Sequence, residues 1–285
     1  MRIALISTGQ TVQDKDLLRE AKRRNHQLII FQINQLPLSS SEKINISFSD
    51  FDLIYWRIGN PKIRQIIALR VTRNGIPFIN SGYWRYPLLG EKSYQIYRVS
   101  LLGIKVPKTY LIDAEKYQFS ELKKNLGLPL ILKKNIGAMG KNVWLINNGA
   151  EIKKIIKTFS LKEFLAQKFL PNNGDYRVLV VGKKAIGVFK RIPKNGEFKA
   201  NIALGGHGEK VENKKISNYL KLLAEKICQA LGLEIAGIDF IESRKEFYFI
   251  ESNSIVQWQG FQKTTKINVA KKIFDYFEQI KSGSH

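Results

Sequence analysis

The sequence has one cysteine and no long hydrophobic run, and both scarcities limit what the chain can be. With Cys228 alone, an internal disulfide is excluded, which fits a reducing compartment. No apolar run approaches the roughly eighteen residues of a membrane-spanning helix, so no membrane partner is expected. Residues 1–9 become polar too early for a signal peptide and instead predict a first core strand. We therefore expect a cytoplasmic protein.

Acidic residues are also scarce relative to basic ones. The chain has 24 Asp and Glu against 47 Lys and Arg, a formal net charge of +23. A basic surface attracts polyanions such as nucleotides, acidic peptides and nucleic acids. The excess is mostly dispersed lysine, however, and a lysine-rich coding bias explains it equally well. A nucleic-acid- or ribosome-associated binding protein stays open, and clustering of the charge on one face would favour it.

The length of 285 residues and the 44% hydrophobic content allow a sizeable core, and more than one domain is expected. Residues 1–88 alternate between short apolar strands and helical stretches, which predicts a small parallel sheet with helices on both faces. The fourth strand of this sheet is predicted at residues 77–80. After the first strand only Thr8-Gly9 occurs, so the Gly-x-Gly-x-x-Gly fingerprint is absent and dinucleotide binding is not supported.

Two apolar stretches near the C-terminus, residues 235–242 and 247–253, predict an antiparallel strand pair. Glu251 and Asn253 are two residues apart and therefore point to the same face. Asp239 on the partner strand joins that face if the turn has an odd number of residues or if the pair contains a bulge. Two carboxylates and an amide oxygen, without His or Cys, suit Mg²⁺. Taken alone, a surface hairpin with solvated acids explains the same residues.

The order of motifs along the chain favours the metal site. A strand ending in Lys133 precedes a glycine-bearing loop, Gly174-Asp175-Tyr-Arg177 follows, and Lys263-Thr-Thr-x-x-Asn268 comes after the hairpin. This order resembles that of RimK-type ATP-grasp ligases over nearly the whole chain. The resemblance implies an α/β (α+β) structure, in which an ATP-grasp fold is preceded by a small Rossmann-like parallel domain. The expected divisions are an N-terminal domain (1–88), a small ATP-grasp subdomain (89–168) and a C-terminal subdomain with the metal site (169–285), of which 282–285 are taken as an expression-vector remnant.

The resemblance also implies the site residues, with ATP and Mg²⁺ (or Mn²⁺) as cofactors. The implied metal ligands are Asp239, Glu251 and Asn253. The implied nucleotide-binding residues are Lys92, Lys133, Gly137, Gly140, Gln167, Lys168, Phe169 and Asp175. The implied catalytic residues, which would neutralise charge during phosphoryl transfer, are Arg191, Lys199 and Asn201. The implied substrate residues are Arg57, Gly205, Gly206 and Trp258.

Four positions depart from the family pattern. The mildest departure is Asn142, which replaces the family's third loop glycine, because Asn tolerates a left-handed backbone. Lys168 stands where the family usually has Glu, which puts a side-chain role there in doubt but leaves backbone recognition of adenine. Lys199 replaces the more usual Arg, which keeps the positive charge but loses the paired hydrogen bonds of a guanidinium. Trp258 lies in a loop that lacks the family's Pro-Gly, and it either lines the substrate pocket or plugs a domain interface. For Arg57, an ordinary surface loop is as good an explanation as a place in the substrate cleft.

The implied reaction is carboxylate–amine ligation through an acylphosphate, with an amino acid such as glutamate added to a protein tail, a carrier protein or a small acidic acceptor. The positive charge favours an acidic acceptor such as a glutamate-rich tail. A homo-oligomer is the family's usual state and is expected only on that ground. An ATP-binding protein that has lost ligase activity is the other alternative, and the intact trio of Asp239, Glu251 and Asn253 argues against it.

Overall fold

The computed structural model describes residues 1–9, 11–33, 48–59, 61–72, 75–113, 115–137, 142–159, 163–194 and 205–282. Within these ranges the strands form three sheets, of three, four and five strands. The strands of each sheet fall within one of the three divisions expected from the sequence, although the division into domains itself stays a prediction. None of the helices in the described ranges is long and apolar enough to cross a membrane.

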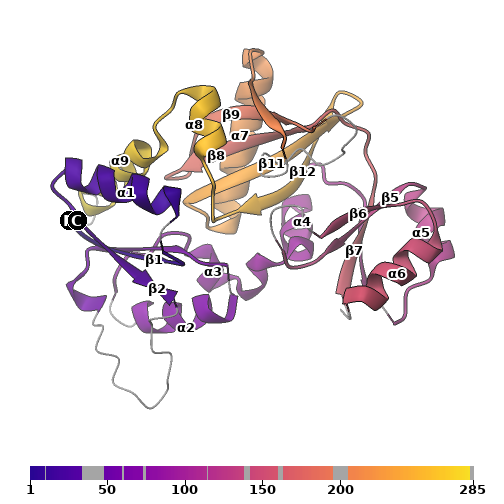
Figure 1. Cartoon of the computed structure of the whole chain (residues 1–285), viewed down its shortest axis with the longest axis horizontal. Coiled ribbons are helices and arrows are strands. Elements are labelled where there is room, and N and C mark those ends of the chain that lie inside the picture. Colours follow the sequence, from indigo (N-terminus) through magenta and orange to yellow (C-terminus); the bar gives the residue numbers. More distant parts are fainter. Residues whose placement is uncertain are drawn as a thin grey trace.

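The first sheet is parallel and has the order β2–β1–β3. Alternate residues of β1 enter different cores. Ile3 and Leu5 pack toward α1 (Val12–Arg23) and α9 (Val269–Ser282), while Ala4 and Ile6 pack toward α2 (Pro61–Thr72). Helices therefore cover both faces, as Figure 1 shows. The elements are β1 (Arg2–Ser7), α1 (Val12–Arg23), β2 (Gln27–Gln32), η2 (Phe48–Asp50), β3 (Leu53–Arg57), α2 (Pro61–Thr72) and α3 (Gly82–Arg85).

The fourth strand predicted in this part of the chain is not formed. Residues 77–80 make only an isolated parallel bridge, between Phe78 and Ile54. Asn80 has a left-handed backbone with φ of 64°, which ends the extended conformation. Its side chain instead bonds the backbone of Glu234 and Ile235, and so ties this segment to the C-terminal part of the chain.

The second sheet is antiparallel, with the order β4–β7–β5–β6. Its apolar face is covered by α5 and α6, which bury Leu122, Leu126 and Ile152 against β5 and β7. The elements of this region are η3 (Pro87–Gly90), α4 (Lys92–Ser100), β4 (Thr109–Asp113), α5 (Phe119–Leu126), β5 (Leu130–Lys134), β6 (Val143–Ile146), α6 (Gly149–Phe159) and β7 (Glu163–Lys168).

The third sheet is antiparallel, with the order β10–β9–β8–β11–β12. Helix α7 buries a stripe of Leu220, Ala224, Ile227 and Leu231 against it, and Cys228 is buried beside that stripe. The elements are β8 (Asp175–Val181), β9 (Lys184–Ile192), β10 (His207–Lys210), α7 (Lys214–Leu231), β11 (Ile235–Ser243), β12 (Glu246–Asn253), α8 (Gln259–Thr265) and α9 (Val269–Ser282). In Figure 1 the second sheet lies to one side of the third, with α4 between them.

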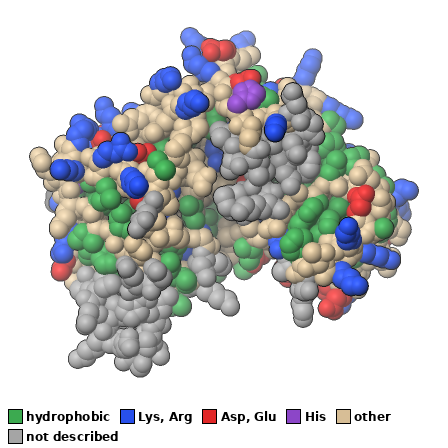
Figure 2. Space-filling model, in the orientation of Figure 1, with side chains coloured by type: hydrophobic (Ala, Val, Ile, Leu, Met, Phe, Trp, Pro, Cys, Tyr) green, Lys and Arg blue, Asp and Glu red, His purple; other side chains and the backbone are tan. Residues whose placement is uncertain are grey.

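Basic side chains are spread over the face of the molecule that Figure 2 presents. Figure 2 shows Lys and Arg scattered across the visible face rather than gathered in one patch. This face therefore offers no concentrated basic surface to support the nucleic-acid alternative, which stays untested.

Candidate active site

The β11–β12 hairpin brings the three candidate metal ligands together. Its turn has two residues, Arg244 and Lys245, both with positive φ (51° and 63°), as in the tight turns that favour hairpins. An even-numbered turn would by itself pair Asp239 with Ile250. A bulge shifts the register between Asp239 and Phe240, so that Asp239 lies directly opposite Glu251. The bulge that the sequence analysis required is therefore present.

Asn253 completes the group. Its side-chain nitrogen donates to Glu251 Oε1 at 3.0 Å and to Asp239 Oδ2 at 3.4 Å. Asp239 is only 2% exposed. Three oxygen-bearing side chains thus converge at one point, and this donor set suits a hard divalent cation. Rotation of the Asn253 amide about its last side-chain torsion would present its oxygen in place of its nitrogen.

Two arginines of the same sheet bind Asp239, one from the adjacent strand β8 and one from β9 beyond it. Arg177 on β8 donates to both carboxylate oxygens, from Nε to Oδ1 at 2.7 Å and from Nη2 to Oδ2 at 2.6 Å. Arg191 on β9 donates to Oδ2 of the same residue at 2.9 Å and also binds Asp175, its cross-strand partner. Buried carboxylates require such partners, and this network fixes their positions.

Lys92 lies at the start of α4 and reaches the same group. Its ammonium lies 3.2 Å from Glu251 Oε2 and donates to the carbonyl oxygen of Gly137 at 2.6 Å. Burial alone raises the pKa of Glu251, but the charges of Lys92 and Lys133 and the hydrogen bond from Asn253 outweigh it and lower the pKa to about 2. Glu251 is therefore ionised and ready to bind a cation.

Lys133 lies on β5 and is 3% exposed. Its ammonium donates to Gln167 Oε1 at 3.1 Å, and Gln167 in turn donates to Thr109. Burial lowers the pKa of Lys133 to about 8; the positive charge of Lys92 acts in the same direction, and Glu251 opposes both. A buried lysine without a carboxylate in contact can accept an anionic ligand.

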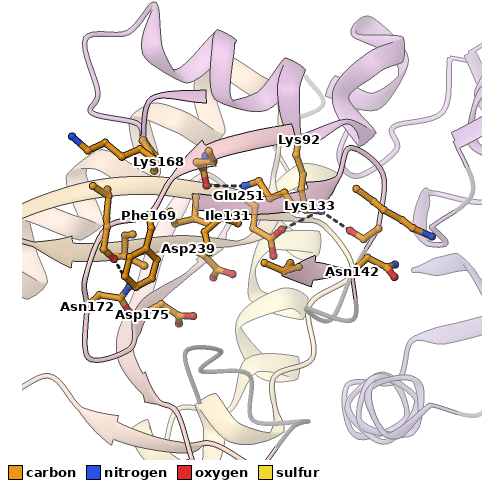
Figure 3. Close-up of a pocket in the computed structure, with 18 of the residues that line it drawn as sticks. Lys92, Ile131, Lys133, Asn142, Lys168, Phe169, Asn172, Asp175, Asp239 and Glu251 are labelled. Atoms are coloured by element: carbon orange, nitrogen blue, oxygen red, sulfur yellow. Dashed lines mark hydrogen bonds and ion pairs between the residues drawn. The ribbon is translucent and has the colours of Figure 1, made fainter. Parts of the chain in front are cut away.

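A cavity of about 160 Å³ lies between the second and third sheets, and its charged and polar lining includes Lys92, Lys133, Gln167, Asp175, Arg191, Asp239 and Glu251. One part is charged, and Figure 3 shows Lys92, Lys133 and Glu251 meeting there, while Phe169 lies near Asn172 in another part. The apolar walls are formed by Pro107, Ile131, Val143, Phe169, Leu170, Ile241 and Ile250. An apolar slot that leads to clustered cations fits a flat heteroaromatic base followed by phosphates.

Lys168 also lines this cavity, and its side chain is exposed. Its backbone N–H is donated to the carbonyl oxygen of Lys108 at 2.9 Å, so that group is already used within the protein. The expectation that the backbone here recognises adenine therefore falls on Phe169 and Leu170, which line the cavity just after β7.

A second cavity of about 560 Å³ adjoins the first. The two share Lys92, Gly137, Arg191 and Glu251 in their linings. Beyond this shared boundary the second cavity is lined by α2, α3 and the segment after β12, including Gly59, Arg64, Tyr83, Ser254, Ile255 and Gln257. The candidate metal ligands Asp239, Glu251 and Asn253 therefore lie where the two cavities meet.

Arg57 and Trp258 lie outside both cavities. Trp258 is fully buried, and its indole N–H donates to Asp16 on α1 at 3.1 Å. The Arg57 guanidinium carbon lies 4.8 Å from the Trp258 ring centroid, and Arg57 also pairs with buried Asp14 and donates to the carbonyl oxygen of Val256. The prediction that these two residues contact substrate is therefore not supported. The geometry of Trp258 fits the alternative of a plugged interface, because it joins α1 to the segment after β12. For Arg57 the alternative of an ordinary surface loop is wrong, since this residue ends β3 and is only 3% exposed.

The remaining predicted residues are placed in part. Gly205 and Gly206 lie just before β10, and neither lines the two cavities. Gly140, Lys199 and Asn201 lie outside the described residues. Of the apolar wall residues only Phe169 was predicted, although Ile131 is two residues from Lys133 on the same strand and so faces the same side. The sequence analysis also missed Arg64 and Tyr83, which belong to no motif.

Comparison with known proteins agrees with this geometry. The family model of the RimK-like ATP-grasp domain matches residues 91–277. A "probable alpha-L-glutamate ligase" of Mannheimia succiniciproducens is 28% identical over 278 residues, which cover 94% of this chain and 87% of that protein. The chain belongs to the RimK-like ATP-grasp family and is an ATP-grasp ligase. The family and the enzyme class expected from the motif order are thereby confirmed.

Solved structures confirm the fold class. A RimK-domain ATP-grasp protein from Sphaerobacter thermophilus superposes with a TM-score of 0.76 at 21% identity, covering 98% of this chain and all of that one. The ATP-grasp ligase PsnB, solved with a phosphomimetic variant of its minimal precursor, Mg and ADP, gives a TM-score of 0.76 at 15% identity and covers 98% of both chains. At these identities the likeness extends to the fold alone.

Proposed function

We propose that this protein joins a carboxylate to an amine in an ATP- and Mg²⁺-dependent reaction, and that it adds an amino acid such as glutamate to an acidic acceptor. The observation that carries the proposal is the shared boundary of the two cavities. Lys92, Arg191 and Glu251 line both, so a nucleotide in the first cavity would present its terminal phosphate to a substrate in the second. The names of the relatives support glutamate as the amino acid.

The side chains that line the first cavity suit Mg-ATP in their chemistry. Asp239, Glu251 and Asn253 would hold the metal, whose charge would neutralise the phosphate oxygens. Lys133, whose ammonium is bonded to neutral Gln167, would contact the phosphates from β5. The apolar walls of the first cavity would enclose the base.

The reaction requires positioning and charge neutralisation more than covalent help from the protein. A carboxylate oxygen of the acceptor attacks the γ-phosphorus, the bond between that phosphorus and the bridging oxygen breaks, and ADP leaves. The amine nitrogen then attacks the acyl carbon and displaces phosphate to leave an amide. Arg191 and Lys92 lie at the boundary where negative charge develops in the first step, and they would stabilise it.

The experiment is a hydroxylamine trap. The protein is incubated with Mg-ATP and glutamate-rich acceptor peptides, with either L-glutamate or hydroxylamine as the amine. An acylphosphate yields a hydroxamate without glutamate, and ligation yields a peptide heavier by one residue. We expect both products from the wild type. Glu251→Gln should abolish both, whereas Glu246→Gln should not, because that residue lies at the exposed end of the same strand and pairs with Lys105.

ADP formation without either product would mean that the protein only hydrolyses ATP. Binding of ATP without any turnover would favour the binding-protein alternative. If ATP does not bind, the nucleotide assignment of the first cavity is wrong.

A further inference from the structure

The second cavity has a basic side chain that the reaction described above does not use. Arg64 on α2 lines this cavity and is only 6% exposed. It does not line the nucleotide cavity, unlike Lys92 and Arg191. Its position therefore concerns the substrate and not the phosphates.

Arg64 is held firmly but is incompletely paired. Its Nε donates to the carbonyl oxygen of Ile58 at 2.5 Å, and its guanidinium carbon lies 3.9 Å from the ring centroid of Tyr83. Tyr83 is itself fixed, because its carbonyl accepts from Gln65 and its hydroxyl accepts from Ser254. The Nη1 of Arg64 is buried and has no hydrogen-bond partner among the described residues.

The other cations of the cavity are neutralised. Lys92 pairs with Glu251, Arg177 with Asp239, and Arg191 with Asp175 and Asp239. For Arg64 the described part of the chain supplies a carbonyl and an aromatic face but no carboxylate. A buried guanidinium with so little compensation is costly, and a carboxylate from a ligand would supply the missing partner. Guanidinium groups bind carboxylates through two parallel hydrogen bonds.

The place of Arg64 indicates which carboxylate this is. The reacting carboxylate must lie at the boundary of the two cavities, beside Lys92 and Arg191. Arg64 connects to that boundary only indirectly, through Tyr83 and Ser254, the residue after Asn253. It would therefore bind a carboxylate that stays charged throughout the reaction. The α-carboxylate of the added amino acid is such a group, because only its amine takes part.

We propose that Arg64 is the residue that binds the free α-carboxylate of the amino acid being added, with Tyr83 holding the guanidinium in place. The proposal rests on the proposed ligase function, since it assumes that the second cavity holds the amino acid. It assigns to α2, a helix without any recognised motif, the selection of substrates with a free α-carboxylate.

The test compares three ligands that differ only in their carboxylates: L-glutamate, its α-amide isoglutamine and its γ-amide glutamine. Their affinities are measured by calorimetry in the presence of Mg²⁺ and a non-hydrolysable ATP analogue. We expect the wild type to bind glutamate and glutamine about 10- to 100-fold more tightly than isoglutamine, the range expected for hydrogen bonds to a charged group. In Arg64→Gln this preference should fall below about threefold, and Arg64→Lys should retain part of it.

Arg85→Gln is the matched control, because Arg85 is an exposed arginine at the end of the nearby α3. Unchanged affinity of Arg64→Gln for the ATP analogue shows that the variant is folded. The proposal is overturned if the wild type binds none of the three ligands, if it does not prefer a free α-carboxylate, or if Arg64→Gln keeps the preference. The wild type could instead bind isoglutamine as tightly as glutamate but glutamine more weakly, with this difference lost in Arg64→Gln. That result would assign Arg64 to the side-chain carboxylate and would also overturn the proposal.

Turnover separates this proposal from the ligase function. The hydroxylamine and peptide assays are run on the same preparations. An intact α-carboxylate preference without acylphosphate or peptide product would leave Arg64 as an anion site while the ligase proposal fails. Product formation by a wild type that shows no α-carboxylate preference would support the ligase function and overturn the assignment of Arg64.

Discussion

Arg177 and Asp239 are cross-strand partners on β8 and β11, and they form a two-point ion pair with distances of 2.7 and 2.6 Å. The side chain of Asp239 is 3% exposed and that of Arg177 is 14% exposed. The pair sets the direction of the carboxylate before any cation binds. Arg177 is therefore a positioning residue for the proposed metal site.

Arg177→Lys tests this role. Lysine keeps the charge but cannot donate to both oxygens at once, so Asp239 should lose its fixed orientation. We expect the Mg²⁺ concentration for half-maximal ADP formation to rise about tenfold, corresponding to about 1.4 kcal/mol. Arg85→Lys, an exposed site, should leave it unchanged. If the half-maximal Mg²⁺ concentration is the same in Arg177→Lys as in the wild type, the Arg177–Asp239 pair has only a structural role.

Substitutions of Trp258 distinguish a role in interface packing from a role in substrate contact. Its side chain is fully buried between the N-terminal domain and the segment after β12. Trp258→Ala should lower the free energy of unfolding by about 3–5 kcal/mol, as removal of large buried aromatics does. Trp258→Phe should cost less, about 1–2 kcal/mol, mainly through the lost hydrogen bond to Asp16.

The measurement is urea unfolding together with the KM for the amino acid in Trp258→Phe. An unchanged KM is expected from interface packing. A raised KM with little loss of stability would restore the substrate-contact prediction.

Much of the fold and part of the site could be predicted from the sequence. The strands around Asp239 and Glu251 have clear apolar patterns, and Lys133 lies on a strand that a motif identifies. The pairing of Asp239 with Glu251 could not be derived, because it depends on a bulge that no local pattern specifies. Ile250 illustrates the same limit. It faces the cavity by alternation, and the bulge turns its neighbour Glu251 to the same side.

Residues outside the motifs were predicted least well. Arg64 lies on an ordinary basic helix, and only tertiary packing places it in the second cavity. For Arg57 and Trp258, which lie in or beside motifs, the sequence left a substrate role and another interpretation equally open. Their burial against each other depends on contacts between segments about 200 residues apart in the sequence, such as that from Arg57 to Val256. Local patterns contain no information about such contacts.

Gly82 marks a close approach between α3 and the end of α7. Its N–H donates to the carbonyl oxygen of Gly232 at 2.8 Å, and a Cβ at Gly82 would lie 1.8 Å from the carbonyl oxygen of Leu231. Gly82→Ala should therefore force backbone movement and cost about 1–3 kcal/mol or more in unfolding free energy. Gly90→Ala is the control for stability, because no atom lies within 4 Å of its added Cβ. Equal stability of the two variants would refute the close approach.

Glu20 connects α1 to a charged cluster that includes α9. It accepts hydrogen bonds from Arg23 and Arg24, and Arg24 also binds Asp275 and Glu278. The hydrogen bond from Arg23 lowers the pKa of Glu20, and the hydrogen bond from Arg24 acts in the same direction. Partial burial opposes them, and the net result is a pKa lowered from 4.5 to about 2. The folded state thus binds fewer protons than the unfolded state between these two values, so stability must rise with pH across that interval.

Glu20→Gln removes this contribution. At pH 7 the variant should be less stable than the wild type by about 1–3 kcal/mol, since arginines near α9 lose a nearly buried carboxylate. The difference should persist down to about pH 4.5 and shrink as the pH falls toward 2, where the wild-type carboxylate is protonated too. Glu212→Gln, in an exposed pair with Lys210, should show a difference below about 1 kcal/mol at every pH. Urea unfolding between pH 3 and 7 measures both, and a Glu20→Gln effect that does not change over this range would mean that its cause is packing rather than charge.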